Sequence, residues 1–163
     1  MDTFKLETRS PEETLRLGQR LAQCLKGGEI ICLSGNLGSG KTTLVKGIAR
    51  GLKIEEKKVN SPTFVLMNTY EGKLPLHHFD FYRLGDPKEI AGIGYDEFLY
   101  GNGVAVVEWA ERFGSLMPPE NLEIRLTDAG DDKRILNFIA HGAKYQQIVV
   151  KLFSSTQRLV PRS

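Results

Sequence analysis

The sequence has few cysteines and few histidines. Of its 163 residues, two are cysteines, Cys24 and Cys32, and three are histidines. We expect Cys24 in a helix and Cys32 in a strand, where a free cysteine behaves as a small buried hydrophobic residue. His77 and His78 lack the further ligands nearby in sequence that a metal site requires. A metal centre built on cysteine and histidine is therefore not indicated.

Segments that would carry the chain to a membrane or out of the cell are also missing from the sequence. No apolar run approaches the roughly 20 residues that span a bilayer. Residues 1–5 contain no apolar signal-peptide core. A cytoplasmic protein is therefore expected.

Charge and composition are those of an ordinary globular protein, with 40% hydrophobic residues, 26% charged residues and a net charge of +2. The basic residues are scattered and form no long stripe, so direct reading of a nucleic acid is not indicated. The length suits one domain. We predict a single domain over residues 1–153 and a tail over 154–163, whose end at 159–163 resembles a protease site added to recombinant proteins.

Residues 35–42, Gly-Asn-Leu-Gly-Ser-Gly-Lys-Thr, match the phosphate-binding pattern G-x-x-x-x-G-K-[ST] at every fixed position. Residues 29–34, which are apolar from 30 to 33, predict a buried strand before this loop, and residues 42–52 predict a helix after it. In that setting the backbone N–H groups of the loop and the start of the helix point at a bound phosphate. Lys41 is placed to reach the β- and γ-phosphates, and the Thr42 hydroxyl to hold Mg²⁺. The motif predicts binding of a nucleoside triphosphate.

Two motifs that GTPases use are absent from the sequence. Neither N-K-x-D, which reads guanine, nor D-x-x-G occurs in the chain. We therefore predict ATP as the nucleotide and Mg²⁺ as its metal.

The rest of the pattern predicts a three-layer α/β P-loop domain with a mixed parallel and antiparallel sheet. Residues 63–70 and 76–82 are strand-like, and the short turn between them requires antiparallel pairing. Ser10 is a predicted helix cap. The other predicted elements are a first helix over 10–25, a solvated loop at the charged run 55–58, short helices at 87–91 and 96–100, a buried strand at 104–107, a hairpin of 121–127 with 134–140, and a final helix over 142–153.

Two acidic residues are candidates for the second acidic group that phosphoryl transfer needs near Mg²⁺. Glu108 follows the buried strand 104–107, at the sheet edge where ligands sit in open α/β folds. Asp80 alternates with His78 and Tyr82 on one face of its strand. Either acid alone is ordinarily an exposed or salt-bridged side chain, and it is the phosphate-binding loop that favours a catalytic role.

Several other residues have both a functional and an ordinary interpretation. Residues 61–64 can fold over the γ-phosphate as a switch loop, with Thr63 reporting on the nucleotide, or form a simple turn. We expect surface or packing roles for His77 and His78. The other ordinary interpretations are packing for Trp109 and Phe113, and a surface ion pair for Arg83 instead of a charge-stabilising finger.

Taken together, four motifs resemble one family. Residues 35–44 (GNLGSGKTTL), 61–64 (SPTF), 78–83 (HFDFYR) and 107–111 (VEWAE) occur in this order, with an acidic GYDEF at 94–98. They are similar to the bacterial TsaE ATPases, which act in making threonylcarbamoyladenosine on tRNA. The resemblance extends from about residue 8 to about residue 145.

The resemblance implies a small Mg²⁺-dependent ATPase that works with two partner proteins, TsaD and TsaB. These partners transfer the threonylcarbamoyl group to the adenosine beside the anticodon, and ATP turnover supports repeated cycles of the complex. Contact with tRNA is then indirect. By matching position, the residues implied to bind nucleotide are Ser10, Leu37, Gly38, Ser39, Gly40, Lys41, Thr42, Thr43 and Thr63. Thr42 and Glu108 are the implied Mg²⁺ ligands, and Lys41, Asp80 and Glu108 the implied catalytic residues, with the acid that orders water left open.

Two other functions fit the motif. A small-molecule P-loop kinase is compatible with the length, although no arginine-rich lid segment is evident. A nucleotide-switched binding module with negligible turnover is the other, and residues 61–64 would then be its switch.

Overall fold

The structure is a computed structural model that describes residues 3–36, 38–59, 67–81, 96–99, 101–112 and 117–156. The strands in these segments are β1 (Thr3–Thr8), β2 (Ile30–Ser34), β3 (Met67–Tyr70), β4 (Leu76–Asp80), β5 (Val104–Glu108), β6 (Asn121–Asp128) and β7 (Arg134–His141). The helices are α1 (Pro11–Gln23), α2 (Lys41–Gly51), α4 (Asp96–Leu99) and α5 (Ala143–Thr156), with a short 3-10 helix at Glu56–Lys58.

The strands form one mixed sheet in the order β1-β7-β6-β2-β5-β4-β3. Its centre is parallel, because β2 pairs in parallel with both β5 and β6, and β5 with β4. Both margins are antiparallel, with β3 on β4 and with β7 between β6 and β1. The predicted mixed sheet is confirmed, and the carboxyl ends of β2, β4 and β5 meet at one edge.

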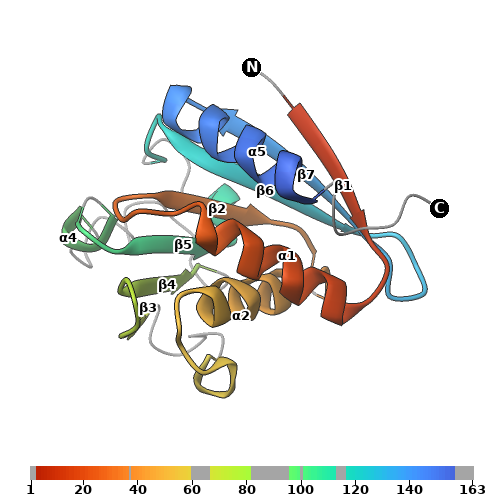
Figure 1. The fold of residues 1–163 in the computed structure, drawn as a ribbon, viewed down its shortest axis with the longest axis horizontal. Coiled ribbons are helices and arrows are strands. Elements are labelled where there is room, and N and C mark those ends of the chain that lie inside the picture. Colours follow the sequence, from red (N-terminus) through yellow and green to blue (C-terminus); the bar gives the residue numbers. More distant parts are fainter. Residues whose placement is uncertain are drawn as a thin grey trace.

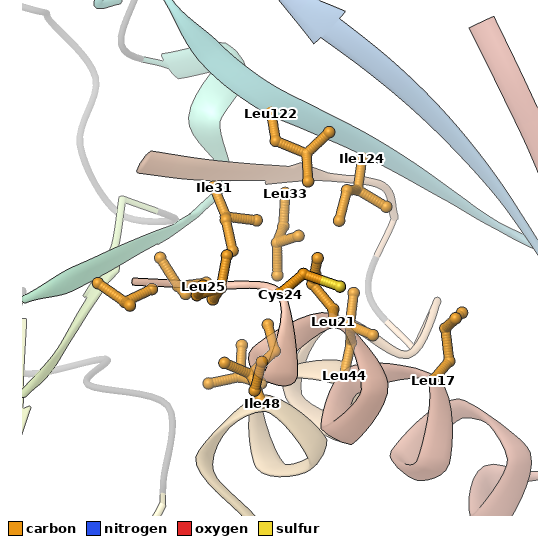
Figure 2. Close-up of a cluster of buried hydrophobic side chains, with 14 of the residues drawn as sticks. Leu17, Leu21, Cys24, Leu25, Ile31, Leu33, Leu44, Ile48, Leu122 and Ile124 are labelled. Atoms are coloured by element: carbon orange, nitrogen blue, oxygen red, sulfur yellow. The ribbon is translucent and has the colours of Figure 1, made fainter. Parts of the chain in front are cut away.

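Helices cover the sheet on one face through a large apolar core (Figure 1). Leu21 of α1 and Leu44 of α2 meet Ile31 of β2 and Leu122 of β6 in the middle of this core, and Figure 2 labels all four. Helix α5 closes the same core with Ile148, Val149 and Leu152. On the opposite face, Leu99 of α4 packs in a smaller cluster with Phe79, Phe81 and Val107. Layers on both faces give the expected α/β architecture.

The boundaries differ from the predictions at several places. Strand β1 was not predicted. It is an edge strand that pairs only with β7, and its short alternating sequence contains few apolar residues. The charged run 55–58, predicted as a loop, contains the 3-10 turn Glu56–Lys58. Helix α5 continues to Thr156, three residues into the predicted tail 154–163. The predicted helix 87–91 and the strand residues 63–66 and 82 lie outside the described residues.

None of the helices within the described residues is both long enough and apolar enough to cross a membrane.

Close packing of α1 on α2 fixes the helix that follows the phosphate-binding loop. Gly47 of α2 faces the α1 backbone, and a Cβ atom added there would lie 2.2 Å from the Leu15 carbonyl oxygen. Gly18 of α1 faces the α2 backbone in the same way, and a Cβ atom added there would lie 2.5 Å from the Leu44 carbonyl oxygen. Because both obstacles are backbone atoms, neither can move aside without shifting a helix.

We expect Gly47→Ala to destabilise the protein by about 1–3 kcal/mol, the usual cost of overpacking. Urea unfolding followed by circular dichroism measures this loss. Lys46→Ala, one residue earlier on the same helix and without such a contact, is the matched control. Equal unfolding midpoints for the two variants would mean that the helices do not approach this closely.

Candidate functional site

The phosphate-binding loop leaves the carboxyl end of β2 and enters α2, as predicted. Gly35, Gly38 and Gly40 have φ angles of 144°, 79° and 103°. These values lie in the region that side chains with a Cβ atom rarely adopt, so the glycines allow the turn. Gly40 is also the N-cap residue of α2 and has no side chain to cap the helix. The first N–H groups of a helix have no partner within the helix, so the start of α2 is a place where an anion can bind.

Lys41 is buried at the centre of this loop, with 5% of its surface exposed. Its ammonium group donates hydrogen bonds to the carbonyl oxygens of Gly35 and of Asn36, the latter at 3.0 Å. The same Nζ lies 4.1 Å from the centre of the Trp109 ring. Burial lowers the pKa of Lys41, and the nearby carboxylates of Glu108, Glu111 and Asp80 partly restore it. A buried cation with acceptors on one side is well placed to receive a phosphate oxygen.

Asp80 and Glu108 lie beside each other at the carboxyl ends of β4 and β5, where they are paired in the sheet register. Both are buried, with 6% and 2% of their surfaces exposed. The Thr42 hydroxyl donates to Glu108 Oε1 at 3.4 Å. The structure thus brings together four site residues predicted from three separate motifs: Lys41, Thr42, Asp80 and Glu108.

Of the surface and packing roles predicted for His78, the structure agrees with packing and adds a contact to the candidate site. His78 is fully buried, and its Nε2 atom is hydrogen-bonded to Glu108 Oε2. Glu108 is therefore held through both oxygens, by Thr42 and by His78. The two-residue alternation of strand β4 placed His78 on the face of Asp80, and that signal was available in the sequence. What the sequence did not show is that β5 brings Glu108 to the same point.

The other predicted nucleotide residues have varied settings. Ser39 is 2% exposed, and its buried Oγ has no hydrogen-bond partner among the described residues. A buried hydroxyl without a partner inside a phosphate-binding loop is a donor that a ligand can satisfy. Thr43 is half-buried in the first turn of α2. Ser10 caps α1, where its Oγ accepts from the Glu13 N–H at 3.1 Å.

Some candidates fall outside the described residues or take ordinary roles. Leu37, Thr63, Arg83 and Phe113 belong to the undescribed segments. His77 is half-buried, and its ring is hydrogen-bonded to the Thr69 hydroxyl at 3.0 Å. Trp109 has a positive φ of 59° and lies under the Lys41 ammonium, a contact that the packing prediction missed.

The donor set fits Mg²⁺ and a polyphosphate together. Magnesium in such sites takes one or two protein oxygens and completes its shell with phosphate oxygens and water. A hydroxyl and a buried carboxylate in mutual contact, Thr42 and Glu108, are such a pair. Lys41 and the start of α2 supply the positive side of the site.

A cavity of about 480 Å³ lies on the opposite face of β2 and is lined by Cys32, Ser34 and residues of β6. Glu123 lies in the wall of this cavity, where its carboxylate is hydrogen-bonded to Arg125 at 2.6 Å and to His141 at 2.9 Å. Burial raises the pKa of the Cys32 thiol to about 12, and the Glu123 charge adds to the effect. Cys32 is therefore a protonated core residue and not a nucleophile.

We expect Cys32 to resist alkylation in the native protein. With a pKa of about 12, its thiolate fraction at pH 8 is on the order of one in ten thousand. Iodoacetamide labelling followed by peptide mass spectrometry measures the rate at each cysteine. Cys24, which is less deeply buried, is the internal reference. Equal labelling rates at the two thiols in the folded protein would contradict the prediction.

Comparison with known proteins identifies one family. A family model described as "Threonylcarbamoyl adenosine biosynthesis protein TsaE" matches residues 8–136. The protein named tRNA threonylcarbamoyladenosine biosynthesis protein TsaE in Bacillus subtilis is 42% identical over 153 residues, which are 93% of this chain and 95% of the relative. The protein of that name in Treponema pallidum is 42% identical over 78% of this chain and 93% of the relative. The one in Aquifex aeolicus is 49% identical over 63% of this chain and 74% of the relative.

A solved structure agrees with this result. The crystal structure of Bacillus subtilis YdiB superimposes with a TM-score of 0.81 at 36% sequence identity. The match covers 95% of this chain and 97% of that chain. The similarity therefore extends over almost the whole of both chains.

Proposed function

The chain belongs to the TsaE family of tRNA threonylcarbamoyladenosine biosynthesis proteins, and from this premise we propose that it is the Mg²⁺-dependent ATPase of that process. In this proposal it binds ATP at residues 35–42, hydrolyses it slowly when alone, and works in a complex with the TsaD and TsaB proteins. ATP turnover then supports repeated cycles of threonylcarbamoyl transfer by that pair.

The observation that carries the proposal is the contact between Thr42 and Glu108. A P-loop threonine and a carboxylate from a neighbouring strand lie 3.4 Å apart, and these are the kinds of oxygen ligand that hold Mg²⁺ beside a nucleotide, which supports the proposal. The carboxylate comes from the strand next to β2, at the sheet edge where ligands bind in this class of fold. Without Glu108 the loop would bind phosphate, but Thr42 would lack a carboxylate partner for the metal.

Each residue then has a separate part in the reaction. Lys41 leaves the carbonyl oxygens of Gly35 and Asn36 for the β- and γ-phosphates and offsets the negative charge that develops on them. Mg²⁺, when bound, neutralises further charge on the phosphates. Asp80 lies beside Glu108 and is the nearby acid for ordering the attacking water, while His78 holds the Glu108 carboxylate in place.

Release of inorganic phosphate from ATP, measured with and without Mg²⁺ and then with the TsaB–TsaD pair added, tests the proposal. We expect slow Mg²⁺-dependent turnover that rises when the pair is present. If the rate of ATP hydrolysis is the same with and without the pair, and the protein does not associate with the pair, the proposed role in the complex is wrong. Phosphate found on an added metabolite instead of in solution would favour a kinase. ATP-dependent association without any turnover would favour a nucleotide-switched binding module.

A further inference from the structure

Arg134, outside the phosphate-binding motif, contacts the loop from the side. It is the first residue of β7 and pairs in register with Asp128 at the end of β6. The turn between these strands is held by its own hydrogen bonds, from the Ala129 N–H to the Lys133 oxygen at 2.9 Å and from the Lys133 N–H to the Gly130 oxygen at 2.8 Å. Arg134 is therefore presented to the loop by a firmly hydrogen-bonded hairpin.

The guanidinium group joins this hairpin to the loop. One terminal nitrogen donates to Asp128 Oδ1 at 3.2 Å and to the Lys133 carbonyl oxygen at 2.9 Å. The other donates to the Gly38 carbonyl oxygen at 3.2 Å. The side chain is 19% exposed, and its stem lies against Gly40, where an added Cβ would come within 3.7 Å of it. The planar fork suits this double attachment, which a lysine can make only in part.

The bond to Gly38 fixes the orientation of the Gly38–Ser39 peptide. In a trans peptide the carbonyl and the following N–H point in opposite directions. Because Arg134 holds the Gly38 carbonyl outward, the Ser39 N–H points into the loop, where it donates to the Asn36 oxygen at 3.1 Å. Lys41 Nζ donates to that same oxygen at 3.0 Å. The Ser39 N–H and the Lys41 ammonium group thus point at one oxygen atom inside the loop. Donors in loops of this kind point at a phosphate oxygen in the same way.

We infer that Arg134 is a positioning residue for phosphate binding, acting through the Gly38 carbonyl and not through the nucleotide itself. Gly38 has no Cβ atom to restrict its backbone, so without the Arg134 bond only the turn bond from the Ser39 N–H to the Asn36 oxygen holds this peptide. Phosphate affinity then depends on a hairpin distant in sequence. This inference rests on the proposed nucleotide binding.

The test compares ATP with inorganic tripolyphosphate, which carries the phosphates without the nucleoside, by calorimetry in the presence of Mg²⁺. We expect Arg134→Gln to weaken both ligands by the same factor, about tenfold, the effect of losing one hydrogen bond from a charged group. Arg134→Lys is expected to recover part of this loss. Arg125→Gln, on the neighbouring strand and paired with Glu123 instead of the loop, is the matched control and should bind as the wild type does.

Each of the following results would overturn the inference. Unchanged tripolyphosphate affinity in Arg134→Gln would remove the link to the loop, and a loss confined to ATP would place the guanidinium on the nucleoside. A loss that disappears at high salt would be a long-range charge effect, because screening does not restore a lost hydrogen bond. If Arg134→Gln does not fold, Arg134→Lys decides instead: it keeps the positive charge but cannot bond Asp128 and the Gly38 carbonyl together as the guanidinium fork does, and binding equal to the wild type would refute the inference. Failure of the wild type to bind either ligand would count against the proposed function, not against Arg134 alone.

Discussion

Lys41→Ala is expected to lower the rate of ATP hydrolysis at least about a hundredfold, the usual loss when a group that stabilises transition-state charge is removed. The lysine is buried in the loop and surrounded by carboxylates from neighbouring strands. Its charge is held there without solvent, so a water molecule cannot replace it fully. Phosphate release at saturating ATP and Mg²⁺ measures the loss.

Lys41→Met separates the charge from the bulk of the side chain. Methionine has an apolar side chain of similar length and lacks the ammonium group that lies over Trp109, so a comparable loss in this variant would assign the effect to that group. Lys46→Met, on the same helix, is the control and should retain full turnover. Since Lys41 also contacts the loop carbonyls, thermal unfolding of each variant must be measured alongside. Hydrolysis by folded Lys41→Met at the wild-type rate would refute the assignment.

The parts of the fold and site that the sequence predicted are those with strong local signals. The loop at 35–42, the strand before it and the helix after it follow from glycine spacing and an apolar run. Glu108 at the end of β5 follows from the same kind of run. Asp80 required only the two-residue period of a strand. In each of these cases the neighbouring residues in sequence carried the information.

Contacts between distant segments were the part that the sequence did not predict. The buried bond of His78 to Glu108 depends on the pairing of β4 with β5, which no local pattern specifies. Arg134 lies on the loop because β6 pairs with β2 and β7 with β6, so its place is set by two steps of sheet register. A single histidine or arginine has many ordinary roles, and only its partner in space distinguishes among them.

Glu108→Gln is expected to reduce hydrolysis about a hundredfold or more while changing ATP affinity less than about threefold. Glutamine has nearly the shape of glutamate, and it can accept from His78 and contact Thr42 through its two terminal atoms. The substitution therefore removes the negative charge and leaves the packing in place. Lys41 and the loop continue to bind the phosphates, so turnover and binding separate.

Glu108 can either hold the metal or order the attacking water, and the Mg²⁺ concentration that gives half-maximal turnover distinguishes these two roles. If the carboxylate holds the metal, Glu108→Gln should need several times more Mg²⁺, because a neutral amide is a weaker ligand than a carboxylate. If it orders water instead, turnover falls while the Mg²⁺ requirement stays as it was. Asp80→Asn is the matched variant, since its carboxylate lies beside Glu108 in the sheet register. If the Mg²⁺ requirement rises in one variant and stays unchanged in the other, the first acid holds the metal and the second orders the water. Normal hydrolysis by Glu108→Gln would show that the Thr42–Glu108 contact is structural.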